Sequence, residues 1–595
     1  MKYSKKYFYL ILIFIVFFAN CKIKTKKDVI INRKESLLLI TIDTWRWDYI
    51  GISGMNKVET PNLDFFAKNG LYIKEAITPC PLTTPAHASI LTGEYPLKHR
   101  IFDCTNYKLD PKIYTMPEFF KKLNYETAAF VSSQTLNKEY GLVRGFSKYE
   151  DEFLNFQEVD EIGNGAFRDG ADTLKKVLKY LEDNSSIKNI FLWIHFYDPH
   201  KPYIYHTFHS DKYSDDPYAA QVSYVDELIG KLYSYIKNEK EREWKIVIVG
   251  DHGEGLGDKN KPYHGMGIYR STLSVPLIIY PFVHKFKNDS LILSLTDIFP
   301  LIIKFMGFSN DKEDIISFLE NKKKNEIYAL TVLPSLMFGV NPIFGIRKEN
   351  FMYIKHSSDE LYDIKNDPDE NENLSSNPNY KNVLKDMKNK CGEYFDFKKI
   401  VSIMEPTLIP SEEDELNLKN LGYLEGSSAP KKILQKAELN QILEDWSILN
   451  KIRENNSYGA SDEEKILRNL YLKYPYSSTL AKDLSILLSK SGRLDESIYI
   501  LERALKHNPK DFGILSNLGT LYSIKGRGIE AKMMFLKALN LRKNNPNIHK
   551  NLGILYANVL NMPEKAIYHF EICLDLNPNE PEKEKILKYL SSYKK

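Results

Sequence analysis

Short apolar runs, each bounded by polar or turn residues, recur through the first half of the chain. The clearest lie at residues 37–42, 127–131, 189–196, 245–249 and 275–280. Near-continuous apolar runs of this length are typical of strands that are buried on both faces. Amphipathic stretches of helix length lie between them, for example at residues 116–123 and 171–184. The pattern predicts an α/β fold with a mostly parallel sheet sandwiched by helices.

The end of the chain follows a different pattern. Residues 401–436 are rich in Pro, Glu and Ser and are expected to form a linker. Beyond them Leu484, Leu518 and Leu552 recur every 34 residues in a helical context. This period is the signature of tetratricopeptide helix pairs, so we expect an all-α tetratricopeptide solenoid over residues 437–595. The alternative is a generic helical bundle whose spacing is accidental.

The N-terminus has the layout of an export signal. Lysines precede an apolar run at residues 7–18, which is followed closely by Cys21. The run is shorter than the roughly 20 residues that cross a bilayer. The cysteine resembles the lipobox of bacterial lipoproteins, so residues 1–21 are expected to be a lipoprotein signal with lipidation at Cys21, followed by a tether at 22–34. The alternative is an uncleaved signal anchor. Both interpretations predict a membrane-anchored protein of the cell envelope, outside the cytoplasmic membrane.

Composition excludes some classes of function. The chain has 595 residues, of which 43% are hydrophobic, so it is long enough for two or three globular units. Its formal net charge of +4 gives no basic surface for nucleic acid, and no nucleic-acid partner is expected. Apart from Cys21 there are four cysteines and no CxxC pair, which does not indicate a disulfide framework. One bridge, between Cys80 and Cys104, remains open for an oxidising compartment.

Four short segments carry the candidate chemistry, each at the end of a predicted strand or the start of a helix, where open parallel sheets place their ligands. Asp43 directly follows the run at 37–42 and is either a metal ligand or a helix N-cap. Thr83 or Thr84 is expected to cap a helix with Pro85 in its first turn. The free N–H groups of that helix would face the threonine hydroxyl and any bound anion.

The third segment follows the apolar run at 189–196 and contains Asp198 and His200, with His195 just before them. Acidic and imidazole side chains within one turn of a buried strand indicate metal ligands or an anion-binding histidine.

The fourth segment is the run GDHGE, which leaves the strand at 245–249, with His264 shortly after it. Asp251 and His252 can face one cation there, because the flanking glycines allow a tight backbone turn.

Five segments of the sequence also resemble a known family. In chain order they are ITIDTWRWDYIG, TPNLDFFAKNG, TTPAHASILTGEYP, GDHGEGLGD and ELYDIKNDPDENENL. They resemble the sulfatases of the alkaline phosphatase superfamily, and the match runs over residues 36–374. The resemblance implies a sulfatase-like catalytic domain, placed here at residues 35–400, that acts on a sulfate or phosphate ester with a divalent metal.

The resemblance is incomplete at the nucleophile. The family position of the Cys or Ser that becomes formylglycine is Thr83 in this chain, and the position of the family's arginine is His87. Threonine cannot become an aldehyde, so no formylglycine is expected. Threonine nucleophiles in this superfamily belong to phosphodiesterase-like and phosphotransferase-like members. The resemblance therefore implies Thr83 as the nucleophile and His87 as a further catalytic residue.

The metal set also differs from the family pattern, because the second acidic ligand after the first strand is here Thr44. The resemblance then implies ligands from Asp43, Thr83, Asp251 and His252. A mixed oxygen and nitrogen set favours zinc or manganese, with calcium or magnesium as the alternatives.

The sequence is compatible with one metal ion or with two. Sulfatases usually have a lysine where this chain has His264, and His264 could complete a second metal site with Asp198 and His200. Two cations about 4 Å apart would clamp the attacking and leaving oxygens. With one ion, His200 and His264 would instead contact the anion and assist the leaving group or the water as catalytic residues.

The sequence thus predicts a metal-dependent hydrolase of sulfate or phosphate esters. One alternative is an envelope phosphotransferase that moves a phospho-substituent onto a lipid or glycan. Another is a non-catalytic scaffold that acts through its repeats. Because repeat solenoids present concave surfaces, a protein or peptide partner is expected for residues 437–595 under either interpretation.

Overall fold

The structure is a computed structural model of the whole chain. It describes residues 35–153, 167–258, 263–282, 286, 291–309, 315–322, 326–404, 406–408, 437–455, 460–578 and 580–593. The signal segment with Cys21, the tether and most of the predicted linker lie outside the described residues. Within the described part, no helix is both long enough and apolar enough to cross a membrane.

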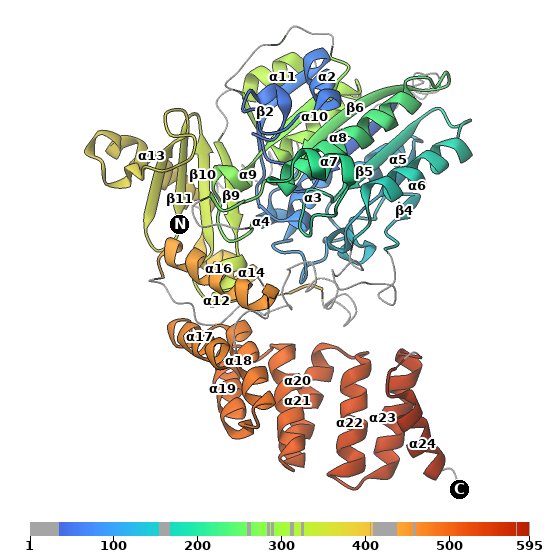
Figure 1. Ribbon diagram of the computed structural model, residues 1–595, viewed down its shortest axis with the longest axis vertical. Coiled ribbons are helices and arrows are strands. Elements are labelled where there is room, and N and C mark those ends of the chain that lie inside the picture. Colours follow the sequence, from blue (N-terminus) through green and yellow to red (C-terminus); the bar gives the residue numbers. More distant parts are fainter. Residues whose placement is uncertain are drawn as a thin grey trace, which may run out of the picture.

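An eight-stranded sheet lies at the centre of the N-terminal unit (Figure 1). In spatial order its strands are β4 (Lys148–Glu150), β3 (Glu126–Phe130), β5 (Ile190–Phe196), β1 (Glu35–Ile42), β6 (Glu243–Gly250), β7 (Ser274–Tyr280), β2 (Leu71–Ile77) and β8 (Ile292–Ser294). Among these strands β7 runs antiparallel to both of its neighbours, and the other pairings are parallel. The predicted mostly parallel sheet is confirmed, and the predicted apolar runs correspond to β1, β3, β5, β6 and β7.

Helices cover both faces of this sheet. They are α2 (Pro61–Asn69), α6 (Gly170–Asp183) and α8 (Pro217–Ile236) on one face, and α3 (Thr83–Thr92), α5 (Met116–Lys122) and α10 (Ile298–Phe305) on the other. Leu38 and Ile40 of β1 pack into the first layer, and Leu37 and Leu39 pack into the second. Because successive strand residues point to opposite faces, a strand covered on both sides is apolar throughout.

The central strands bring the predicted site segments together. Ile42, the last residue of β1, pairs with Phe196 of β5 and with Gly250 of β6. Parallel strands end at the same edge of a sheet, so the residues that follow these three strands lie next to one another.

A second sheet, which the sequence pattern did not reveal, follows the first. Its strands are β9 (Glu326–Thr331), β10 (Ile343–Lys348), β11 (Phe351–Lys355) and β12 (Asp359–Asp363), and every pairing is antiparallel. These strands are short and carry charged residues, so they lack the continuous apolar runs of the first sheet.

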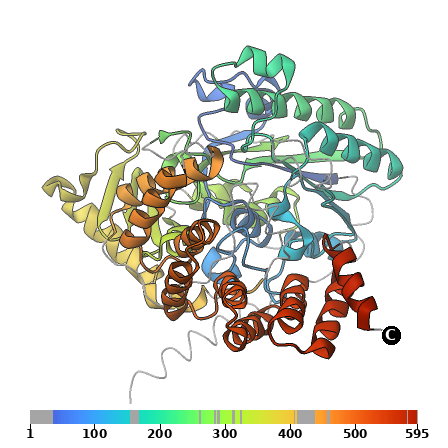
Figure 2. The ribbon, with the colours of Figure 1, turned by 60° about the horizontal axis from the view of Figure 1, so that its bottom comes forward.

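The C-terminal region is helical wherever it is described, in agreement with the sequence prediction. Its helices are α16 (Leu439–Asn455), α17 (Ala460–Lys473), α18 (Ser478–Lys490), α19 (Leu494–His507), α20 (Phe512–Ile524), α21 (Gly528–Leu541), α22 (Pro546–Asn558), α23 (Pro563–Leu576) and α24 (Lys583–Tyr593). From α18 onward they stand in a row beside the N-terminal unit (Figure 1, Figure 2).

The recurring glycines of this region have the same structural role in two successive helix pairs. A Cβ added at Gly519 of α20 would lie 2.5 Å from the ring of Phe535 in α21. A Cβ at Gly553 of α22 would lie 2.5 Å from the ring of Phe570 in α23. Glycine at these positions lets an aromatic ring of the next helix reach the backbone, as expected for small residues between paired helices.

The helical region is packed onto the second sheet. One apolar cluster contains residues of β9, β10 and β11 together with residues of α16 to α24. Phe338 is the last residue of α12 (Leu333–Phe338) and belongs to this cluster. The centroid of its ring lies 4.7 Å from that of Tyr474 and 6.4 Å from that of Trp446. The Ser477 hydroxyl donates to a main-chain carbonyl of α12. The two parts of the molecule therefore share a core in addition to their covalent connection.

The thiols of Cys80 and Cys104 are both free and buried. They lie in a small apolar cluster with Leu82 and Leu333. The bridge that the sequence left open is not formed in this structure, and Cys104 instead accepts a hydrogen bond from the backbone N–H of Thr84 at 3.5 Å.

Candidate active site

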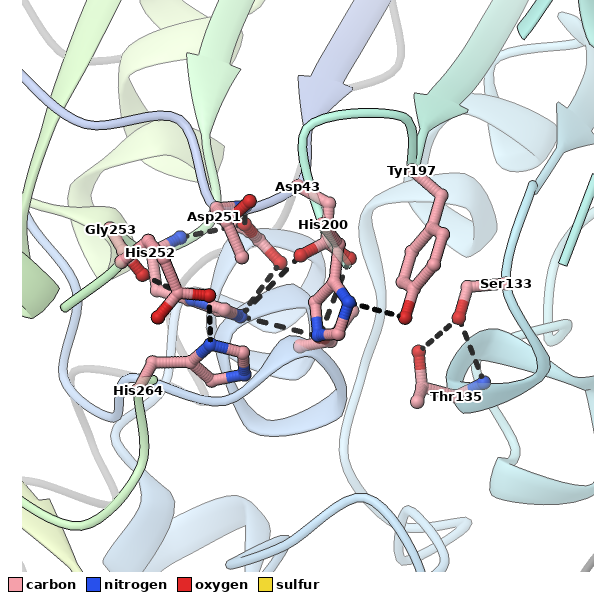
Figure 3. Close-up of polar contacts among 12 residues, drawn as sticks. Asp43, Ser133, Thr135, Tyr197, His200, Asp251, His252, Gly253 and His264 are labelled. Atoms are coloured by element: carbon pink, nitrogen blue, oxygen red, sulfur yellow. Dashed lines mark hydrogen bonds and ion pairs between the residues drawn. The ribbon is translucent and has the colours of Figure 1, made fainter. Parts of the chain in front are cut away.

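Asp43 follows β1, and Asp251 and His252 follow β6, so their side chains meet at the carboxyl edge of the sheet (Figure 3). His252 Nε2 lies 3.8 Å from Asp43 Oδ1 and 3.5 Å from Asp251 Oδ2. Both oxygens are buried and have no hydrogen-bond partner among the described residues. His252 Nδ1 donates to the carbonyl of Gly253 at 2.9 Å, and burial lowers the pKa of His252 well below its usual value. The neutral ring therefore turns the lone pair of Nε2 toward the two carboxylate oxygens.

The Thr83 hydroxyl points into the same space. Thr83 Oγ1 donates to Asp43 Oδ2 at 3.4 Å and lies 3.3 Å from His252 Nε2. Thr83 is the first residue of α3, so its hydroxyl lies at the helix terminus that carries a partial positive charge. The helix end favours the ionised form of this hydroxyl, and Asp43 Oδ2 is placed to accept its proton.

The start of α3 differs from the predicted threonine cap. Leu82 is the N-cap residue, and its side chain makes no capping hydrogen bond. The Thr83 hydroxyl has its partners in the site, and the Thr84 hydroxyl donates to the carbonyl of Thr135 at 2.6 Å. The prediction of a threonine cap is wrong, because both hydroxyls have partners outside the helix.

The side chains around His252 Nε2 fit a divalent cation. Ligands at about 2.0–2.2 Å from a tetrahedral zinc ion lie about 3.3–3.6 Å from each other. The distances from His252 Nε2 to Thr83 Oγ1, Asp251 Oδ2 and Asp43 Oδ1 are 3.3, 3.5 and 3.8 Å. The two carboxylate oxygens, Asp43 Oδ1 and Asp251 Oδ2, have no hydrogen-bond partner among the described residues, and the imidazole lone pair lies beside them. A divalent cation would compensate the two carboxylates and accept the imidazole lone pair as a ligand.

The backbone after β1 is shaped to support Asp251. Thr44 has a φ of 54°, a conformation that costs a β-branched residue about 1–3 kcal/mol. Its N–H donates to Asp251 Oδ1 at 3.0 Å, and its carbonyl accepts a hydrogen bond from the Tyr218 hydroxyl at 2.6 Å. These bonds hold the strained turn and occupy one Asp251 oxygen, so that the other faces His252.

The glycines of the GDHGE segment are required by close approach. A Cβ at Gly250 would lie 2.7 Å from the carbonyl oxygen of Trp45, and one at Gly253 would lie 2.0 Å from that of Ser271. Neither glycine has a positive φ, so the expected reason, a tight turn open only to glycine, is wrong. The absence of a side chain lets β6 and the following loop lie directly against their neighbours.

His87 lies behind the nucleophile position. Its Nδ1 donates to the Thr83 carbonyl at 2.8 Å, and its Nε2 lies 2.9 Å from Thr41 Oγ1, which also accepts from Trp193 Nε1 at 3.0 Å. Burial lowers the pKa of His87 to about 3, so the ring is neutral. Both ring nitrogens contact protein groups, and this arrangement suits a residue that positions the start of α3 better than one that contacts the anion.

His195 contributes to the site from inside β5. Its Nε2 lies 3.3 Å from Asp43 Oδ2, and the backbone N–H of Ser132 donates to its Nδ1 at 3.4 Å. Burial lowers the pKa of His195 to about 3, so the neutral ring carries its proton on Nε2, facing Asp43. The sequence noted His195 only as a neighbour of the third segment. Its role depends on the pairing of β5 with β1, which the sequence does not reveal.

His200 and His264 form the more accessible side of the site. Their side chains belong to residues that are 5% and 7% exposed, whereas Thr83, Asp43 and Asp251 are 0% exposed. The His264 ring lies 5.2 Å from the ring of His200.

The two imidazoles have different protonation. His264 Nδ1 lies 3.0 Å from Glu254 Oε2. Burial opposes the charged form of His264, but the negative charge of Glu254 outweighs it and raises the pKa of His264. His200 Nδ1 lies 2.5 Å from the carbonyl of Lys201 and 2.6 Å from the Tyr197 hydroxyl, while burial lowers the pKa of His200. His264 is thus the member of the pair that keeps its proton to the higher pH. Glu254 was part of the GDHGE segment, but the sequence assigned it no role.

Asp198 does not join these histidines. Its carboxylate accepts from the backbone N–H of Gly170 at 2.8 Å, whereas the His200 ring stacks on Tyr197 with centroids 4.5 Å apart. Of the three groups of described residues whose ligand atoms lie within 4.8 Å of one another, none combines Asp198 with His200 or His264. The second metal site predicted from those three residues is therefore not assembled, because the turn after β5 directs Asp198 toward the start of α6.

Comparisons with known proteins agree with this fold. Residues 35–308 match the sulfatase family model. A sulfatase of Formosa agariphila is 22% identical over 460 residues, covering 62% of this chain and 89% of the relative. A Delta 4,5-hexuronate-2-O-sulfatase of Bacteroides thetaiotaomicron is 23% identical over 438 residues, covering 61% of this chain and 89% of the relative. A solved 2-O GAG sulfatase shares the fold, with a TM-score of 0.51 at 18% identity, covering 67% of this chain and 99% of the other.

Proposed function

We propose that the chain is a metal-dependent hydrolase of sulfate or phosphate esters with Thr83 as its nucleophile, starting from the match of residues 35–308 to the sulfatase family model. The observation that carries the proposal is the position of Thr83 Oγ1, 3.4 Å from Asp43 Oδ2 and 3.3 Å from His252 Nε2 at the N-terminus of α3. No other hydroxyl among the described residues combines this helix end with these contacts.

Asp43, Asp251 and His252 are the proposed ligands of one divalent cation, with Thr83 as the fourth. Zinc or manganese is favoured because the ligands combine carboxylate oxygens with an imidazole nitrogen. A bound cation would lower the pKa of the threonine hydroxyl and neutralise the negative charge of the ester. His195 supports this set from behind, since its Nε2 lies 3.3 Å from the Asp43 oxygen that accepts the Thr83 proton.

In the first step Thr83 Oγ1 attacks the sulfur or phosphorus atom, and its proton passes to Asp43 Oδ2. A bond forms between Oγ1 and the attacked atom, and the bond from that atom to the leaving oxygen breaks. The leaving oxygen takes a proton from His264, whose charged form is stabilised by Glu254. The product of this step is an ester on Thr83 together with the free alcohol.

In the second step the now neutral His264 takes a proton from a water molecule, whose oxygen attacks the same sulfur or phosphorus atom. The bond to Thr83 Oγ1 breaks, and the threonine regains its proton from Asp43. His200, held by Tyr197 and the Lys201 carbonyl, is placed to contact the anion through both steps.

The names of two relatives indicate a class of substrate. The relative from Bacteroides thetaiotaomicron is named for a hexuronate sulfate, and the solved structure for a GAG sulfate. We propose a sulfated or phosphorylated glycan as the substrate. An alcohol in place of water in the second step would give the phosphotransferase alternative, which nothing in the site favours over hydrolysis.

The proposed nucleophile is tested with the purified full-length chain and three p-nitrophenyl compounds: the sulfate, the phosphate and a phosphate diester. At least one should release p-nitrophenol, and Thr83→Ala should lower kcat by at least about 1,000-fold, while Thr83→Ser keeps a hydroxyl and retains part of the activity. Thr84→Ala is the matched control, because that hydroxyl bonds to Thr135 outside the site. Full turnover by Thr83→Ala would exclude the threonine mechanism. Addition of an alcohol acceptor separates hydrolysis from transfer by the products formed.

The remaining predictions concern the setting of the enzyme. We propose a catalytic domain at residues 35–400, a linker at 401–436 and a tetratricopeptide region at 437–595 that binds a protein or peptide. Equivalent close approaches at Gly519 and Gly553, in helix pairs 34 residues apart, support the repeat assignment.

We also propose that lipid on Cys21 anchors the protein in the cell envelope. Cys21→Ser should release it from the membrane fraction.

A further inference from the structure

A second group of ligand atoms lies beside the loop that carries His200. Asp169 precedes α6, Asp198 follows β5, and His206 precedes α7 (Thr207–Lys212). One ligand atom from each of these three side chains lies within 4.8 Å of the others. None of the three belongs to the metal set of the proposed function.

Each of the two carboxylates accepts its hydrogen bonds through Oδ1. Asp169 Oδ1 accepts from the Ala171 N–H and from the Tyr224 hydroxyl, each at 2.8 Å. Asp198 Oδ1 accepts from the Gly170 N–H at 2.8 Å. Asp198 is only 7% exposed, and its Oδ2 is buried with no hydrogen-bond partner among the described residues. A buried carboxylate oxygen without compensation is costly, which indicates a cationic partner.

The imidazole of His206 is held beside these carboxylates by stacking on a tyrosine. Its ring stacks on Tyr224, with centroids 3.6 Å apart and planes inclined by 16°. His206 Nε2 is buried, has no hydrogen-bond partner among the described residues, and lies 3.4 Å from Asp169 Oδ2. This spacing is close to that of two ligands on one tetrahedral ion, about 3.3–3.6 Å.

We propose that Asp169, Asp198 and His206 bind a second divalent cation of the zinc or manganese class. Two carboxylate oxygens and one imidazole nitrogen leave a coordination position for water, as in three-ligand zinc sites. The cation compensates the two neighbouring carboxylates. It also ties the loop between Asp198 and His206, which contains His200, to the start of α6 and to Tyr224 of α8. The site therefore positions an anion-contacting histidine and takes no part in bond breaking.

The test counts ions on the full-length chain. The protein is stripped with a chelator, dialysed and titrated with ZnCl2 or MnCl2 by calorimetry, and the bound metal is measured by mass spectrometry. Wild type should bind two ions per chain. His206→Ala and Asp198→Asn should each remove one ion, and Asp251→Asn should remove the other. Asp198→Asn keeps the bond from Gly170, so loss of folding does not account for its effect.

The matched control is His569→Ala, which removes another histidine stacked on a tyrosine, Tyr556 in α22, away from any of the three ligand groups. It should leave the count at two. A wild-type count that His206→Ala and Asp198→Asn leave unchanged overturns the site, because His206 then only shares a proton with the carboxylates. If wild type binds one ion and His206→Ala removes it, the site stands and the metal of the proposed function fails.

Discussion

In the proposed mechanism, Glu254 sets the pH range in which His264 can protonate a leaving group. The pKa of His264 is raised above its ordinary 6.5, chiefly because the Glu254 charge outweighs the effect of burial. The imidazole therefore keeps its proton to a higher pH than free histidine and loses it as pH rises through that raised value. Glu254→Gln should shift the alkaline limb of the kcat/KM profile, which reports the first step, to lower pH.

The measurement is kcat/KM against pH for both proteins with the best of the p-nitrophenyl substrates. Glu227→Gln is the control, since Glu227 contacts His209 outside the site at 2.7 Å. An alkaline limb that does not move in Glu254→Gln removes His264 from the role of general acid.

The buried carboxylates predict how metal affects stability. Burial first, and then the charge of Asp43, raise the pKa of Asp251 well above 3.8. Without a cation the folded state binds a proton that the unfolded state has released, so stability should fall as pH rises above about 4 toward the raised value. A cation removes this loss, and at 100 times its Kd it stabilises by about 2.7 kcal/mol.

Urea unfolding at pH 5 and pH 7, with EDTA and with zinc, measures this effect. The chelated wild type should lose stability between these pH values, whereas chelated Asp251→Asn should lose less. Equal pH dependence in the two chelated proteins would contradict a buried, ion-dependent carboxylate at this position.

At the level of elements, the junction of β6 and its loop depends on glycine. A Cβ at Gly250 would lie 2.7 Å from the Trp45 carbonyl and 2.8 Å from Val275 Cβ, and neither group can move easily in a packed sheet. Gly250→Ala should destabilise the protein by about 1–3 kcal/mol and lower activity by displacing Asp251. Urea unfolding together with kcat tests this.

Gly392→Ala in α13 (Lys381–Tyr394) is the control, since its Cβ would meet nothing within 4 Å. That helix should gain up to about 1 kcal/mol. If Gly250→Ala unfolds like wild type, the close approach does not limit this junction.

The elements that the sequence predicted are those whose signal is local. β1, β5 and β6 are covered on both faces and appear as unbroken apolar runs, and the chemistry at their ends could be placed from position alone. Asp43, Asp251 and His252 were singled out in this way, whereas Thr83 was singled out by the resemblance to the sulfatases. The antiparallel sheet β9 to β12 was missed, because its short strands carry charged residues and no apolar run.

Other site residues could not be predicted because their roles depend on contacts between distant segments. His195 faces Asp43 only through the pairing of β5 with β1. Asp198 meets Asp169 and His206 only because the turn after β5 packs on α6. The predicted metal site of Asp198 and His200 assumed that residues close in sequence bind the same ion, whereas the turn directs the two side chains apart.

For the whole molecule, the shared core between the second sheet and the helical region predicts cooperative unfolding. Phe338 is fully buried, and its ring lies 4.7 Å from that of Tyr474. Phe338→Ala should cost about 3–5 kcal/mol and separate the helical region from the catalytic domain. Differential scanning calorimetry should then resolve two transitions where wild type shows one.

Phe208→Ala is the control, because Phe208 is 70% exposed and its loss should leave the thermal profile unchanged. Two separate transitions in wild type would show that the shared core does not couple the two parts.

The shared core also fixes the position of the helical region relative to the second sheet. The row of helices from α18 to α24 continues an apolar cluster that begins in the second sheet, so it cannot swing about the chain connection alone. We expect any molecule bound along this row to be held at a fixed distance and orientation relative to Thr83. If that molecule also carries the proposed substrate, we expect only an ester at the matching spacing to reach Thr83.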